Sequence, residues 1–86
     1  MPQVSRFYGI IILIFFDDHA PPHFHVKYSE FSCKVSIVDL TIIAGYIPQR
    51  AYALVLEWAS LHRTDLLNNW ELAQQHQELI PIEPLK

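Results

Sequence analysis

The first half of the chain has the hydrophobic patterns of short β-strands. Residues 4–16 carry isoleucine and phenylalanine at both alternating positions, which is typical of a strand covered on both faces. Residues 31–38 alternate between apolar and polar side chains, which indicates a strand with one buried face. Weaker runs at 23–28 and 41–47 complete a set of about four strands. The short connections between them predict an antiparallel meander.

The second half has the period of an amphipathic helix. Pro48 is well suited to a first helical turn, where its missing N–H is not needed. An apolar stripe follows it at helical spacing, at Ala51, Leu54, Val55, Trp58 and Leu61. Residues 62–65 interrupt this stripe, and a second one occupies residues 65–77. We therefore expect two helices, with one long bent helix as the alternative.

These elements predict one α+β domain that spans residues 1–86, because the chain is too short for a second domain. Residues 1–47 would form the antiparallel β-meander, residues 48–78 two helices packed on one face of it, and residues 79–86 an extended tail. Hydrophobic residues make up 51% of the chain. Helices on one face would leave apolar side chains on the other, so we expect a homodimer or a dedicated partner protein.

Charge and cysteine content narrow the class of protein. The net charge is −3 and the six lysines and arginines are dispersed, so nucleic acid is expected only as a substrate. The single cysteine, Cys33, cannot form an internal disulfide, which indicates a reducing compartment and a buried thiol. The apolar run 7–16 has about half the length of a membrane span. Charged residues follow it directly, so we expect no membrane association and a cytoplasmic location.

The candidate chemistry lies in the sequence DDHAPPHFH, which holds three of the five histidines. His23 and His25 share one face of a strand because they are two positions apart. Two such imidazoles can bind one metal ion, with His19, Asp17 or Asp18 from the preceding turn as a third ligand. Zinc is the candidate metal, because imidazoles with a pKa of about 6.5 are mostly neutral at neutral pH. The metal-ligand candidates are His19, His23, His25 and Asp18.

Two alternatives to a metal remain open. In the first, the histidines act as base and acid on RNA or a nucleotide, with Arg6 or Lys27 as the phosphate-binding cation and Tyr8 or Tyr28 as a donor. This requires the strands at 4–16 and 23–28 to pair directly as a hairpin. Its catalytic candidates are His19, His23, His25, Arg6 and Tyr8. In the second alternative, the histidines are structural or exposed at the surface.

Three stretches, SRFYGIII, DHAPPHFHV and ALVLEWASLHRTDLLNNWELA, together with the closing IEP, resemble the bacterial family of domain of unknown function 4160 over nearly the whole chain. The resemblance implies a small bacterial protein, often encoded beside another small protein, in an arrangement similar to toxin–antitoxin pairs. The family pattern falls on Arg6, Phe7, Tyr8, Gly9, His19, Pro22, His23, Phe24, His25, Trp58, His62 and Trp70.

Three functions are therefore considered. The first is an interaction subunit of a two-gene, toxin–antitoxin-like pair, as a homodimer or bound to the small protein encoded by the adjacent gene. The apolar excess and the resemblance favour this one. The second is a small histidine-dependent ribonuclease or nucleotide hydrolase, with or without a metal, that uses the hairpin at residues 17–25. The third is a structural metal-binding domain. The sequence does not decide whether the protein is an enzyme.

Overall fold

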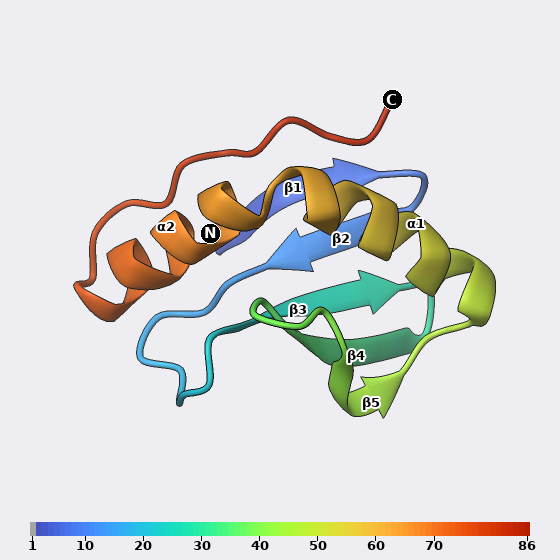
Figure 1. Ribbon diagram of the computed structural model, residues 1–86, viewed down its shortest axis with the longest axis horizontal. Helices are drawn as coiled ribbons and strands as arrows, with labels where there is room; N and C mark the ends of the chain where they lie inside the picture. Colours follow the sequence, from blue (N-terminus) through green and yellow to red (C-terminus); the bar gives the residue numbers. More distant parts are fainter. Residues whose placement is uncertain (1) are drawn as a thin grey trace.

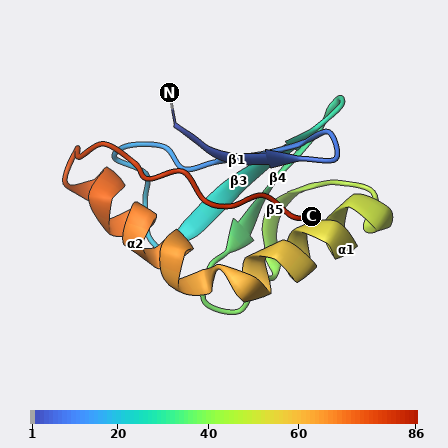
Figure 2. The same ribbon diagram turned by 90° about the horizontal axis from the view of Figure 1, so that it is seen from above.

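The computed structural model describes residues 2–86 and shows an α+β fold (Figure 1). Five strands form one antiparallel sheet in chain order, and both helices lie on one side of it (Figure 2). The predicted meander followed by two helices is confirmed. The elements are β1 (Gln3–Phe7), β2 (Ile10–Leu13), β3 (His23–Tyr28), β4 (Phe31–Ser36), β5 (Ile42–Tyr46), α1 (Gln49–Leu61) and α2 (Arg63–Gln74).

The sheet has five strands because the stretch at 4–16 folds back on itself. Tyr8 and Gly9 both have positive φ angles, 50° and 78°, and Phe7 pairs with Ile10 across them. Two residues with positive φ form the tight turn whose twist matches that of the flanking strands. The expectation of one continuous strand at 4–16 is therefore wrong. The expected antiparallel pairing between the segment 4–16 and β3 is made by β2 alone, and β1 pairs with β2 and not with β3.

The helical half contains two helices. α1 ends at Leu61 and α2 begins at Arg63, and His62 between them has a φ of −127°, outside the helical range. The backbone N–H of His62 still donates to the carbonyl of Ala59, 3.1 Å away. The alternative of one bent helix is therefore wrong. Among residues 2–86, no helix combines the length and hydrophobicity needed to cross a bilayer.

Trp58 joins the helices to the sheet. Its side chain is fully buried, with ring centroids 5.3 Å from Phe7 on β1 and 6.1 Å from Phe24 on β3. The indole N–H donates to the carbonyl of Glu83 at 2.8 Å, so the tryptophan also fixes the chain's last segment. Cys33 lies in the same core, and burial raises the pKa of its thiol to about 11. The expectation of a buried thiol is confirmed.

The two faces of the sheet differ in character. Alternate residues of β3 and β4 face the helices and are buried, as at Phe24 and Val35. The residues between them face away from both helices, and we call this side the open face. On β3 and β4 the open face presents His25, Lys27, Ser32 and Lys34.

Gly45 allows β5 to approach β4 closely. Its φ is +83°, and a Cβ placed there would lie 2.4 Å from the carbonyl oxygen of Ser32 and 2.7 Å from Cα of Cys33. The pairing shifts register between Lys34 and Val35, where β5 carries an extra residue. The extra residue is Ile43, so the bulge lies two positions before Gly45, which itself pairs with Cys33.

The C-terminal tail, residues 79–86, runs along the seam between β1 and the helices (Figures 1 and 2). The buried amide of Asn69 on α2 makes two hydrogen bonds with the backbone of Ile80, at 2.7 and 2.9 Å. The N–H of Ile82 donates to the carbonyl of Val4 at 2.7 Å. The tail thus covers the outer edge of β1.

Candidate metal centre

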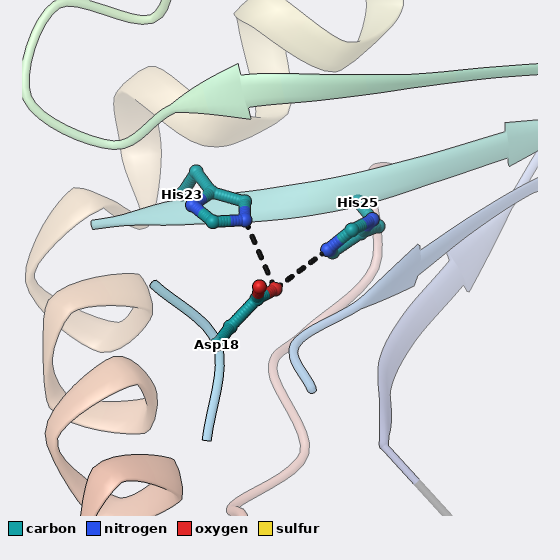
Figure 3. A group of neighbouring side chains, drawn as sticks. All are labelled: Asp18, His23 and His25. Carbon is teal, nitrogen blue, oxygen red and sulfur yellow. Dashed lines mark hydrogen bonds and ion pairs between the residues drawn. The ribbon is translucent and has the colours of Figure 1, made fainter. Parts of the chain in front are cut away.

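Asp18, His23 and His25 meet at the end of the sheet near α2 (Figure 3). The Oδ2 atom of Asp18 lies 3.0 Å from Nε2 of His23 and 2.8 Å from Nε2 of His25. One nitrogen or oxygen atom from each residue lies within 4.8 Å of the other two. The three side chains therefore converge on one point.

Two parts of the chain hold this cluster in place. His23 and His25 are the first and third residues of β3, so their rings lie on one side of the strand with centroids 5.1 Å apart. Asp18 comes from the loop between β2 and β3. The side-chain amide of Gln74, at the end of α2, donates to the backbone carbonyl of Asp18 at 3.1 Å. Packing of α2 on the sheet thus positions the aspartate.

The hydrogen bonds of His23 define which nitrogen carries a proton. Its Nδ1 lies 2.8 Å from the backbone carbonyl of Pro21, and a carbonyl oxygen can only accept, so Nδ1 is the donor. In the neutral ring this leaves a lone pair on Nε2, which points at Oδ2 of Asp18, itself an acceptor. Two acceptors at 3.0 Å repel each other unless a proton or a metal cation lies between them.

The same pattern is common around metal-bound histidines, which usually donate their second ring N–H to a backbone carbonyl or a carboxylate. That outer hydrogen bond fixes the tautomer and aims the other nitrogen at the metal. His23 is thus oriented as a metal ligand would be.

Burial and hydrogen bonding shift the pKa of Asp18 in opposite directions. Burial is the largest single influence and acts to raise its pKa. The hydrogen bond from His25, the charge of His23 and the backbone N–H of His19 together outweigh burial, and the pKa lies below its ordinary value. The carboxyl group is therefore ionised at neutral pH, as a metal ligand must be.

The donor set suits zinc. Zinc binds imidazole nitrogen and carboxylate oxygen at about 2.0–2.2 Å, and tetrahedral geometry then separates the ligand atoms by about 3.3–3.5 Å. The separations of 3.0 and 2.8 Å would have to widen by about 0.3–0.7 Å to reach this range. All three ligand atoms lie within 4.8 Å of one another. Two histidines and one carboxylate also bind iron(II) in some enzymes, and elemental analysis distinguishes the two metals.

The remaining predicted site residues lie outside the cluster. The backbone N–H of His19 donates to Oδ1 of Asp18 at 3.1 Å, and its exposed side chain does not belong to the group. Asp17 pairs with His76 of the helical half, at 2.7 Å. Arg6 lies on β1, and Tyr8 lies in the β1–β2 turn at the opposite end of the sheet (Figure 1). The structure therefore does not assemble Tyr8 with the histidines.

Two features of the site were not identified from sequence. The first is the carbonyl of Pro21, which orients His23. The second is Phe15, whose ring meets that of His25 edge-on with centroids 4.5 Å apart. Phe15 continues the alternation of β2, which puts it on the open face beside His25. The alternation of side chains along residues 10–15 was the signal in the sequence that could have placed Phe15 beside His25.

The fold and the site together define a small α+β domain with a cluster of two histidines and one aspartate at the end of its sheet. The chain belongs to the family described as Domain of unknown function (DUF4160), whose model matches residues 9–71. The matched segment runs from the β1–β2 turn into α2 and includes all three cluster residues. No curated protein and no solved structure matches the chain.

Proposed function

We propose that this protein is a zinc-binding domain whose metal is held by Asp18, His23 and His25 and keeps a coordination position open, as in metal-dependent hydrolases. The orientation of His23 carries the proposal. Its Nδ1 is committed to the carbonyl of Pro21, and its Nε2 lone pair meets a second acceptor on Asp18. Either a bound cation or a second proton on the ring removes that repulsion, and the metal content of the protein distinguishes the two.

Ligand number and exposure favour a catalytic over a structural metal. Structural zinc sites usually have four protein ligands, whereas catalytic sites have three and leave a position for water or substrate. The cluster found among residues 2–86 has three members. The side chains of Asp18 and His25 are 19% and 21% exposed, so a small molecule has access from the open face.

The test is the metal content of untagged protein purified without chelator or nickel. We expect about one zinc per chain in the wild type. Removing an outer-shell partner of a metal ligand already costs 10–100-fold in affinity, so losing a ligand should cost at least about 100-fold. Asp18→Asn and His23→Ala should therefore each lose the zinc, with affinity measured by competition against a chromogenic chelator.

His76→Ala and His19→Ala are the matched controls, since both histidines belong to or contact the same loop region but lie outside the cluster. Both variants should retain zinc. Zinc that persists in Asp18→Asn and His23→Ala, iron in place of zinc, or a wild type that binds no metal would each contradict the proposal.

A second candidate function, association with another copy of the chain, is favoured by the edge of the sheet. Among residues 2–86, β5 pairs with β4 alone, so one side of its backbone is open for hydrogen bonding. The apolar side chain of Ile43 on this strand is 45% exposed. We propose that two copies pair through β5, in keeping with the interaction subunit of a bacterial, cytoplasmic, toxin–antitoxin-like pair.

Light scattering at micromolar concentration tests this association. The wild type should have the mass of a dimer, and Ile43→Lys should be a monomer because a lysine on an edge strand opposes strand pairing. Leu61→Lys changes an exposed leucine at the end of α1 in the same way and should remain dimeric. A monomeric wild type that also fails to co-purify with the product of the adjacent gene would rule out the interaction function.

A further inference from the structure

We propose that the open face beside the cluster binds a nucleoside phosphate, either free or as one residue of a single strand. This names the substrate class of the proposed metal centre and rests on that proposal for catalysis, whereas the binding itself does not require the metal.

The open face carries an excess of positive charge. Arg6 is paired with Ile11, which is paired with Lys27, so these positions form one row across the sheet. Lys34 lies in the next row, directly opposite His25. Half of the six lysines and arginines of an acidic chain are thus on one face, and none of the five strands contains aspartate or glutamate.

These cations are not neutralised within the molecule. The four ion pairs found among residues 2–86 all involve histidine, and none involves a lysine or an arginine. Like charges gathered on one face repel each other, and a bound anion relieves that repulsion. The chemistry of the face is therefore complementary to phosphate.

The open face is also hollowed next to the cluster. A shallow hollow of about 250 Å³ is lined by Leu13, Phe15, His25, Lys27, Lys34 and Ala44, among others. His25 belongs to both the hollow and the cluster. Lys27 follows it by two residues on β3, and Lys34 lies across from it on β4, so both lysine positions flank His25. A phosphate bound between the lysines would lie beside the metal position.

The aromatic ring of Phe15 points to a nucleotide rather than a simple anion. The ring lines the hollow and is 39% exposed, so part of it is accessible to a ligand. Exposed aromatic rings beside basic side chains bind nucleic acid bases by stacking. The hollow's volume of about 250 Å³ lies just below the range of about 300–1,000 Å³ for ligand pockets, so it would hold part of a single nucleotide and leave the rest in solvent.

Binding is tested with two probes, AMP and a single-stranded oligouridine, each titrated into zinc-loaded and zinc-free protein. The variant Lys27→Gln plus Lys34→Gln should weaken binding about tenfold, and Phe15→Ala should have a similar effect because one stacked base contributes about 5–150-fold. Two phosphate contacts should give the oligouridine a slope of about −1.4 in log affinity against log salt concentration, and the double variant should flatten it.

The matched control is Arg50→Gln plus Arg63→Gln, which removes the same charge from exposed positions at the starts of the two helices. It should leave both affinities unchanged. Binding of AMP would show that a free nucleotide is enough for recognition. Binding of oligouridine alone would show that the face recognises a nucleotide only within single-stranded nucleic acid. Equal weakening by both double variants, or the absence of binding to zinc-loaded protein, would overturn the inference.

The two proposals fail separately. A protein that binds zinc but neither probe would overturn the nucleotide inference and leave the metal centre intact. A protein that binds AMP through Lys27 and Lys34 but takes up no metal would overturn the metal centre and leave the phosphate-binding face intact.

Discussion

Replacing Trp58 with alanine should lower the free energy of unfolding by about 3–5 kcal/mol, the usual cost of removing a large buried aromatic side chain. The indole is fully buried between Phe7 of β1 and Phe24 of β3. Alanine would leave a cavity at the centre of the contact between α1 and the sheet. It would also remove the hydrogen bond to the carbonyl of Glu83.

Urea denaturation followed by circular dichroism measures this effect. Small domains have total stabilities near the lower end of about 5–15 kcal/mol, so the Trp58→Ala variant should be largely unfolded at 37 °C. Trp58→Phe keeps a ring in the core and should lose less. Leu61→Ala, on the exposed side of the same helix, should change stability by no more than about 0.5 kcal/mol. A loss below about 1 kcal/mol in Trp58→Ala would show that the core does not depend on this side chain.

Gly45→Ala should destabilise the protein by about 2–5 kcal/mol. An L-residue at positive φ costs about 1–2 kcal/mol, and overpacking costs about 1–3 kcal/mol more. Both apply here, because the φ is +83° and the new methyl group would lie 2.4 Å from the carbonyl oxygen of Ser32. That atom belongs to the backbone of β4 and cannot rotate away, so β5 must move.

Gly9→Ala is the matched control for Gly45→Ala. Gly9 also has a positive φ, +78°, but the nearest atom to a Cβ placed there is 3.7 Å away, in the ring of Tyr28. Only the conformational cost of about 1–2 kcal/mol should appear. Hydrogen exchange locates the damage, which should be greatest in the amides of β4 and β5 for Gly45→Ala. Equal losses in the two variants would mean that the close approach of β5 to β4 is not required.

The strands that sequence predicted best are those in which burial alternates. Residues 31–38 have one buried side, and β4 lies within them. The prediction of one strand at 4–16 was wrong because apolar residues lie on both sides of the turn at Tyr8 and Gly9. The pattern of burial therefore does not change where the chain reverses. Gly9 was the only local sign of that reversal, and Tyr8 is an uncommon residue at positive φ.

The candidate site was predictable to the extent that it depends on strand geometry. His23 and His25 share a side of β3 because of the two-residue period of a strand. The choice among Asp17, Asp18 and His19 could not be made from sequence, because the conformation of the loop depends on distant contacts. Gln74, which holds the backbone of Asp18, is 56 residues away in the chain.

The tail at residues 79–86 makes the two edges of the sheet unequal. A sheet with two exposed edges can add strands on both sides and grow into a fibre. In this protein the tail covers β1, whereas β5 is exposed. Two copies joined through β5 would therefore present two covered edges, and polymer growth would end at the pair. If the proposed pair forms, the tail would prevent further strands from adding at β1, and its detachment would allow the pairs to polymerise.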